Sequence, residues 1–165
     1  MLVLLFYLGD VMYSIRCDKV REIAPMVNLK ELPHAPDYFA GLFNYRGMIV
    51  PVIDLRRLIQ HQSCDIRLST RIILLDYVKP DNTPAIFGIM AERVTEAVMK
   101  PLDALISSGI TMANMPYLGS LLVDGNTMVQ YIAVEALPGA LNLSPTVEND
   151  EAITMNRRRT DSLLP

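Results

Sequence analysis

The chain has 165 residues, of which 51% are hydrophobic and 20% are charged, and its formal net charge is -3. This is the length of one domain, which can bury a hydrophobic core without disulfides or metal ions. The balance of apolar and charged residues excludes general disorder, and the lack of a basic excess argues against a nucleic-acid partner.

The first apolar segment, Leu2 to Leu8, is followed by a Gly9-Asp10 turn. It is too short to span a bilayer, which takes about 20 apolar residues. It also lacks the basic region and the small-residue cleavage site of a secretion signal. We therefore expect a buried β-strand in a cytoplasmic protein that does not insert directly into a membrane. Cys17 and Cys64 lie outside any CxxC pair, so free thiols are expected.

Short apolar runs separated by Gly, Pro, Asp and Asn recur along the chain and predict a series of β-strands. In chain order, the strands are expected over Leu2–Leu8, Val11–Cys17, Gly41–Tyr45, Met48–Ile53, Arg71–Val78, Ala85–Ala91, Arg93–Met99, Tyr117–Val123 and Thr127–Ile132, with a short extended piece over Val27–Leu32. About ten strands in roughly 140 residues is the spacing of a β-sandwich or of small barrels, so the predicted fold class is mainly β.

The segments between these strands are expected to hold only brief helices and turns. Helical turns are predicted over Asp18–Ile23, after Asp37, over Leu55–Ile59 and over Ala133–Leu137, with Asp18, Asp37 and Asp54 as N-caps. A rigid corner is predicted at Pro33-His-Ala-Pro36, a polar surface loop over residues 60–70, and a loop or short helix over residues 101–109. From Ser144 onward the pattern ends, which divides the chain into a domain over residues 1–143 and a polar, disordered tail over residues 144–165.

The sequence contains none of the motifs GxxxxGK[ST], GxGxxG and HExxH, which are typical of enzymes. The two histidines, His34 and His61, and the two cysteines do not have the spacing of zinc ligands. His61 and Cys64 could form a nucleophilic pair, but their polar neighbours indicate a surface loop without a shaped pocket. Asp54 and Glu22 could act as an acid–base pair, but Asp54 is better explained as a helix cap. We therefore expect no catalytic residue, no metal ion and no cofactor.

The segment that stands out is Gly41-Leu-Phe-Asn-Tyr-Arg-Gly-Met-Ile-Val-Pro-Val-Ile-Asp-Leu55. It places a charged residue, Arg46, between two apolar strands, and Gly47 behind it permits a tight turn with positive φ. Pro51 cannot donate a hydrogen bond within a sheet, so it marks an edge or a bulge. The segment is either a plain hairpin with Arg at its tip by chance, or a hairpin that presents Arg46 to a partner.

This segment resembles the motif of the CheW-like family, hydrophobic-Gly-hydrophobic-hydrophobic-Asn-x-Arg-Gly followed by Pro-Val-hydrophobic-Asp-Leu. The resemblance runs from about Phe6 to Leu137 and includes an opening hairpin, a Val-x-Glu-hydrophobic element at Val20–Ile23 and the proline corner at Leu32–Pro36. Two departures are visible. Glu92 stands where the family often has Asp, and Val134-Glu135 stands where it commonly has Leu-Asp.

The resemblance implies two intertwined SH3-like five-stranded β-barrels with short helices, related by pseudo-symmetry around one core. It implies a non-catalytic adaptor that couples the cytoplasmic tip of methyl-accepting chemoreceptors to the regulatory domain of a CheA-type histidine kinase, within receptor arrays at the inner membrane. The alternative is a CheW-like domain that competes with or inhibits the coupling protein. Carried over by motif, the partner-binding residues would be Val20, Glu22, Gly41, Leu42, Phe43, Asn44, Arg46 and Gly47, with Glu22 and Arg46 as a polar pair.

Three further segments, Ser69–Ile72, Pro116–Gly119 and Val123–Gly125, are similar to couplers of Wsp-type surface-sensing pathways. Those pathways control a diguanylate cyclase instead of the flagellar motor. The resemblance leaves the receptor, its stimulus, the kinase and the oligomeric state open.

Overall fold

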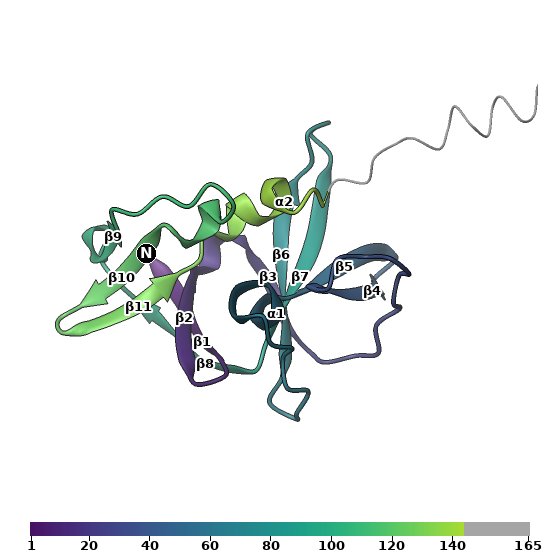
Figure 1. Ribbon diagram of the computed structural model, residues 1–165, viewed down its shortest axis with the longest axis horizontal. Helices are drawn as coiled ribbons and strands as arrows, with labels where there is room; N and C mark the ends of the chain where they lie inside the picture. Colours follow the sequence, from purple (N-terminus) through teal and green to yellow (C-terminus); the bar gives the residue numbers. More distant parts are fainter. Residues whose placement is uncertain (144–165) are drawn as a thin grey trace, which may run out of the picture.

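The computed structural model describes residues 1–143, which form a mainly β structure with two short helices (Figure 1). The strands are β1 (Leu2–Leu8), β2 (Val11–Arg16), β3 (Val20–Pro25), β4 (Phe39–Tyr45), β5 (Met48–Asp54), β6 (Arg71–Val78), β7 (Pro84–Ala91), β8 (Arg93–Met99), β9 (Leu105–Ser107), β10 (Ser120–Asp124) and β11 (Thr127–Tyr131). The helices are α1 (Leu55–Gln60) and α2 (Leu137–Ala140), and the 3₁₀ turns are η1 (Cys17–Lys19), η2 (Leu102–Ala104), η3 (Pro116–Leu118) and η4 (Val134–Ala136).

The predicted mainly β class is confirmed. The polar tail predicted over residues 144–165 lies outside the described residues, so the tail and the domain boundary stay predictions. Within residues 1–143, no helix has the length and the apolar composition that crossing a membrane requires.

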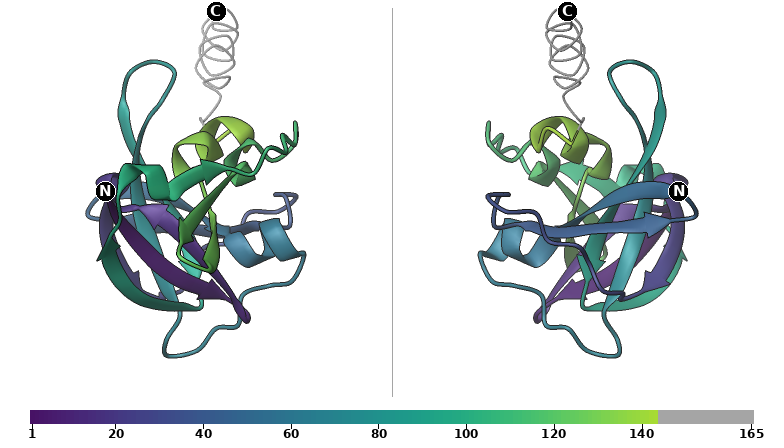
Figure 2. Two further views of the ribbon diagram at one scale, coloured as in Figure 1. Left: turned by 90° about the vertical axis from the view of Figure 1, so that its left-hand side faces the viewer. Right: turned by 90° about the vertical axis from the view of Figure 1, so that its right-hand side faces the viewer.

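Two sheets build the molecule, a six-stranded one with the order β8-β1-β2-β11-β10-β9 and a five-stranded one with the order β3-β6-β7-β5-β4. Figure 1 shows the six-stranded sheet on the left and the five-stranded sheet with α1 on the right, and Figure 2 shows both from the sides. The chain begins in the six-stranded sheet, builds the whole five-stranded sheet and then returns. The two units are therefore intertwined, as the resemblance implies.

The strand order of the five-stranded sheet recurs in the six-stranded sheet. When β3-β6-β7-β5-β4 is compared with β8-β1-β2-β11-β10, successive neighbours are antiparallel, antiparallel, parallel and antiparallel in both. Short helices also follow the corresponding strands, α1 after β5 and η4 with α2 after β11. Each sheet thus contains the predicted five-stranded unit, and the pseudo-symmetry is visible in its pairing.

Strand β9 is a sixth member that the sequence did not predict. It lies with η2 in the segment expected to form a loop or short helix, and it pairs with Ser120–Leu122 of β10. Three residues are too few to produce an alternating pattern, so β9 can be recognised as a strand only from its pairing with β10.

Contacts between β3 and β4, the two edges of the five-stranded sheet, close that sheet into a barrel. Lys30, in the extended segment after β3, exchanges two backbone hydrogen bonds with Leu42 of β4, with N–O distances of 2.7 and 2.8 Å. Near the other end of β4, the Tyr45 hydroxyl donates a hydrogen bond to the Glu22 carboxylate of β3.

One hydrophobic core is filled from both sheets. Phe6 and Ile15 come from the six-stranded sheet, Ile73 and Ile89 from the five-stranded sheet, and all four are almost completely buried in the same cluster. Leu137 of α2 belongs to that cluster as well. A smaller buried cluster, Val3, Ala104, Leu122 and Val129, lies within the six-stranded sheet and η2, so the shared cluster accounts for most but not all of the buried apolar side chains.

Two predicted helical turns are wrong. The segment Asp18–Ile23 contains the end of η1 and then β3, because Val20–Pro25 pairs with β6, with one bulge between Val20 and Glu22. After Asp37 there is a single β-turn, in which the Phe39 N–H bonds to the carbonyl three residues earlier, and β4 begins there. The Asp37 carboxylate lies 3.2 Å from Arg57 instead of capping a helix.

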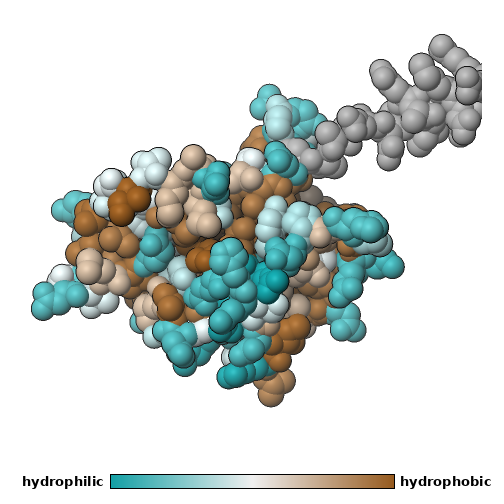
Figure 3. Space-filling model, in the orientation of Figure 1, coloured by the Kyte–Doolittle hydropathy of each residue, from teal (hydrophilic) through white to brown (hydrophobic). Residues whose placement is uncertain are grey.

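The loop after α1 is only partly the exposed polar loop that the sequence predicted. Cys64 and Thr70 are buried, and the Asp54 carboxylate accepts the Cys64 N–H at 2.9 Å as well as capping α1. The side chains of Ile66 and Leu68, by contrast, are 70% and 99% exposed. This loop extends at the bottom of Figure 1, and Figure 3 shows hydrophobic surface there.

An ion pair joins the two sheets where the chain passes from β7 to β8. Arg56 of α1 lies 2.6 Å from Glu92, and the two side chains are only 16% and 13% exposed. Glu92 also accepts the backbone N–H of Gly9 at 2.7 Å and of Asp65 at 2.9 Å. Burial alone would raise the pKa of Glu92, but these backbone donors and the Arg56 guanidinium together hold it below its usual value.

We expect Glu92→Gln to lower the free energy of unfolding by about 2 kcal/mol at pH 7, because it removes one partner of a largely buried, hydrogen-bonded ion pair. The folded carboxyl has the lower pKa, so this stabilisation is present above the unfolded value of about 4.3 and is lost as the pH falls through the folded value. Urea unfolding measured from pH 7 into the acid range should therefore show the two proteins converging.

Glu96→Gln, on the exposed surface of β8, is the matched control and should leave the unfolding curve unchanged. A difference between E92Q and the unmodified chain that stayed constant down to acid pH would contradict the ion pair as its source.

Candidate partner-binding site

The turn between β4 and β5 presents Arg46 on a constrained backbone. Tyr45 pairs with Met48, so the loop consists of Arg46 and Gly47 alone, with φ angles of 50° and 86°. Positive φ at both central residues is typical of a type I′ turn, whose twist suits a two-residue hairpin. The Asn44 side-chain oxygen accepts the Gly47 N–H at 2.8 Å. The predicted tight turn is confirmed, and Arg46 shares the left-handed conformation expected only of Gly47.

Three side chains from two strands meet at this turn, and we call Glu22, Tyr45 and Arg46 the Arg46 cluster. The Arg46 guanidinium lies 5.1 Å from the centre of the Tyr45 ring and 3.8 Å from the Glu22 carboxylate. The Tyr45 hydroxyl donates to the same carboxylate oxygen. The ring therefore supports the guanidinium while its hydroxyl orients the carboxylate.

Tyr45 was not among the predicted site residues. In the motif it occupies the position between Asn and Arg that the family pattern leaves open. The available signal was its place two residues after Phe43, which puts both rings on one face of β4 beside the charged turn. The two rings pack edge to face, with centroids 6.3 Å apart.

Much of the Arg46 cluster is open to solvent. The Arg46 and Glu22 side chains are 78% and 42% exposed, so their pairing contributes little to the stability of the fold. The hydrogen bond to Glu22 raises the pKa of the Tyr45 phenol, so the phenol remains a donor to the carboxylate. What the cluster supplies is a guanidinium of fixed direction, with donors left for a carboxylate or a carbonyl oxygen.

The other predicted site residues divide between two faces of β4. Phe43 points inward and packs, like Val20 of β3, against the shared core, and both are half-buried. Leu42 and Asn44 point to the opposite face, because side chains alternate along a strand. The structure therefore brings together Glu22, Arg46 and the residues of the turn, and it separates Leu42 from Phe43.

Gly41 is buried beneath the segment that closes the barrel. Its φ is 147°, and an added Cβ would lie 2.7 Å from the Leu29 Cβ and 2.9 Å from the Lys30 carbonyl oxygen. Only glycine lets β4 approach this segment so closely. Gly41 thus positions the hairpin, while its own surface is covered.

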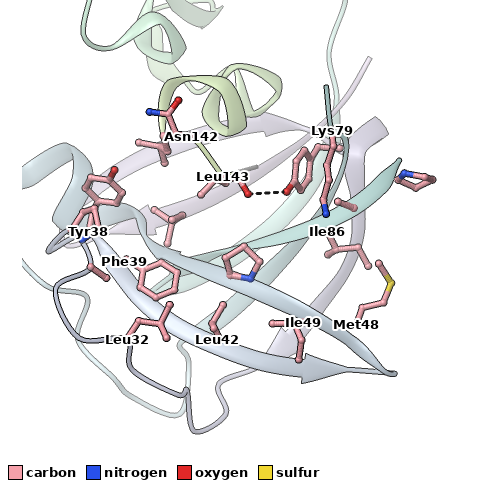
Figure 4. Close-up of a pocket in the computed structure, with 18 residues that line it drawn as sticks. Leu32, Tyr38, Phe39, Leu42, Met48, Ile49, Lys79, Ile86, Asn142 and Leu143 are labelled. Carbon is pink, nitrogen blue, oxygen red and sulfur yellow. Dashed lines mark hydrogen bonds between the residues drawn. The ribbon is translucent and has the colours of Figure 1, made fainter. Parts of the chain in front are cut away.

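A second surface lies on the outer face of the same hairpin. β5 pairs with β7 only where Val52–Asp54 meets Gly88–Met90, and beyond this pairing the strands leave an apolar groove of about 680 Å³ between them. We call this the outer groove. Its lining includes Leu32, Phe39, Leu42, Ile49, Ile86 and Leu143 (Figure 4).

The residues considered for catalysis have structural roles. The Asp54 carboxylate accepts the Arg57 N–H at 3.0 Å and caps α1, as predicted. Burial, together with the nearby Asp54 charge, raises the pKa of the Cys64 thiol, which keeps it in the unreactive protonated form. His61 ends α1 with a φ of 58°. Among residues 1–143, no three His, Cys, Asp or Glu side chains are grouped as a metal site requires.

Comparison with known proteins shows similarity along almost the whole described chain. A model of the CheW-like domain matches residues 2–141. The chain is 28% identical over 137 residues to the chemotaxis protein CheW of Klebsiella aerogenes, which covers 81% of this chain and 79% of that protein. It is 24% identical over 134 residues to the probable chemotaxis protein CheW of Rhizobium etli, covering 80% of this chain and 83% of that protein.

A solved structure agrees with the architecture. The crystal structure of the scaffolding protein TtCheW from Thermoanaerobacter tengcongensis aligns with a TM-score of 0.71 and 20% sequence identity, covering 82% of this chain and 86% of that chain. This likeness confirms the predicted SH3-like β-barrel fold.

We expect Gly41→Ala to lower the free energy of unfolding by about 2 kcal/mol, because the added methyl group collides with Leu29 and with backbone at a positive φ. Gly119→Ala is the matched control, because its φ is -77° and nothing lies within 4 Å of the added methyl group. Urea unfolding measures both variants, and equal stability of the two would contradict the close approach at Gly41.

Proposed function

The chain belongs to the CheW-like domain family, and we propose from this membership that it is a non-catalytic adaptor that couples methyl-accepting chemoreceptors to a CheA-type histidine kinase. The observation that carries the proposal is the Arg46 cluster, which stands at the tip of the hairpin that contains the family motif. Its relatives include proteins named chemotaxis protein CheW.

The cluster suits the cytoplasmic tip of a receptor, which is a bundle of helices. An exposed guanidinium held beside half-buried apolar side chains can pair with a carboxylate or carbonyl on a helix while the apolar surface receives the helix face. Arg46, Glu22, Asn44 and Gly47 would provide the polar part of this contact, and Val20 and Phe43 the apolar part. Leu42 would contact a partner only on the other face of β4, because it lines the outer groove. Gly41 would act indirectly, by placing the hairpin.

The regulatory domain of the kinase is the second proposed partner. It is homologous to the coupling proteins themselves, so it would present a barrel surface instead of a helix. A protein that binds both would work in the cytoplasm, at receptor arrays on the inner membrane. We further propose a Wsp-type pathway, because Ser69–Ile72, Pro116–Gly119 and Val123–Gly125 are similar to its couplers.

Reconstitution distinguishes a coupler from a competitor. Receptor-containing membranes and kinase are mixed with and without this chain, and phosphorylation of the kinase is followed. The proposal expects phosphorylation to rise when the chain is added. A fall would show instead a CheW-like domain that competes with or inhibits the coupling protein, and no change would contradict both.

We expect Arg46→Glu to abolish binding of a receptor-tip fragment while unfolding stays cooperative, because Arg46 is exposed and its replacement disturbs no core contact. Arg16→Glu, which alters an exposed arginine on the six-stranded sheet, is the charge-matched control and should bind normally. Pull-down and thermal melting measure the two properties. Retained binding by R46E would remove Arg46 from the site.

We expect Tyr45 to act on binding through its neighbours. Tyr45→Phe keeps the ring under Arg46 and removes the hydroxyl that orients Glu22, so it should weaken receptor binding less than Arg46→Ala. A double-mutant cycle between Glu22→Ala and Arg46→Ala should give a coupling above about 0.5 kcal/mol, and adding Tyr45→Phe should reduce it. Strictly additive losses would contradict a cluster that acts as a unit.

A further inference from the structure

We propose that the outer groove is a docking site for a segment of this same chain, residues 147–155, which covers the groove until another ligand displaces it. The proposal concerns a surface on the opposite side of the β4–β5 hairpin from the Arg46 cluster, and it does not depend on the adaptor function.

The groove is built to bind side chains and not a strand. Three prolines, Pro36, Pro51 and Pro84, line it, and a proline has no N–H to donate to an added strand. Ile49 projects on this face with 64% of its surface exposed. An occupant would therefore gain affinity mainly by burying apolar side chains, at about 25 cal/mol for each Å² removed from water.

The described chain ends inside the groove. Residues 141–143 form part of its wall, and the Tyr77 hydroxyl donates a hydrogen bond to the Leu143 carbonyl at 3.3 Å, as the dashed line in Figure 4 shows. The following residues thus start at the groove and need no long tether. About ten residues can span roughly 33 Å when extended, which exceeds the radius of gyration of about 15 Å expected for a domain of this size.

The charges of groove and segment are complementary. Lys79 is the one side chain in the lining that is charged at neutral pH, and within residues 1–143 it has no ion-pair partner. The segment carries an acidic run, Glu148-Asn-Asp-Glu151, followed by the apolar residues Ile153 and Met155. If the acidic run lay near Lys79, Ile153 and Met155 would lie over the groove.

Tethering makes even a weak contact effective. A short linker gives an effective concentration in the millimolar range, so an affinity of about 0.1 mM would keep the groove mostly covered. Nine residues are too few to build a core of their own, but so short a segment can still bind a surface that is already formed. The result is an internal competitor for any partner that needs the groove.

The test changes only the segment, in the full chain. In I153D/M155D, the backbone amides of Ile49, Ala85 and Ile86 should exchange hydrogen faster than in the unmodified chain. Binding of the apolar dye 8-anilinonaphthalene-sulfonate should increase as well, because losing one buried apolar anchor lowers the docking constant about tenfold. L163D/L164D replaces two apolar residues by Asp outside residues 147–155, and it should leave hydrogen exchange and dye binding unchanged. Unchanged exchange and dye binding in I153D/M155D would overturn the proposal.

A charge exchange separates specific docking from a general effect of the segment. Lys79→Glu should expose the groove as I153D/M155D does, and combining it with Glu148→Lys, Asp150→Lys and Glu151→Lys should cover the groove again. If the combined variant does not cover the groove again, this would contradict the proposed pairing of Lys79 with the acidic run. Protection that rises with protein concentration would identify a second copy as the occupant and would also overturn the proposal. Neither receptor nor kinase is present, so the outcome is independent of the adaptor function.

Discussion

The hydrophobic core shared by the two sheets is the constraint on which the rest of the structure depends. Strands β1 and β2 come first in the chain but pair with β8 and β11, which follow the five-stranded sheet. The buried side chains of β1, such as Phe6, pack in the same cluster as those of the five-stranded sheet that lies between these strands in the chain. Arg56 and Glu92 fix the junction where the chain crosses, and they make the relative placement of the two sheets definite. This definite placement gives the hairpin of β4 and β5 a rigid base.

Most of the family motif determines how the hairpin folds and not what it touches. Gly41 lets β4 approach Lys30, Asn44 and Gly47 form the turn, and Asp54 caps α1. The contacts and hydrogen bonds that explain each of these residues lie within the chain. Arg46 is the exception, because its guanidinium is exposed and its backbone conformation is one that only the surrounding turn maintains. A residue held in a sparsely populated conformation at an exposed tip suits the partner contact that we propose for Arg46.

The sequence predicted the strands that have clear alternation or strong turn signals. It predicted the hairpin of Gly41–Tyr45 and Met48–Ile53 and the cap at Asp54, because each has a local signature. The pair of Glu22 with Arg46 was implied by the family resemblance instead, and the two side chains lie 3.8 Å apart. It failed where distant pairing decides the conformation, as in β9 and in β3, whose residues carry a plausible helix signal but gain more from β6. Tyr45 was missed for a related reason, since its hydroxyl has no partner until closure of the barrel places Glu22 beside it.

The two surfaces on the β4–β5 hairpin are mechanically connected, because alternate residues of β4 serve each of them. Leu42 lines the outer groove, and Tyr45, three residues further along, holds Glu22 on the other face. Leu42 is also the residue that binds Lys30 and closes the barrel. A groove occupant that moved Leu42 would have to move β4 or break these backbone bonds, and either change would alter the distance between Tyr45 and Glu22. An occupant that displaced Leu42 would therefore affect the orientation of Arg46 through one strand and not through a chain of distant contacts.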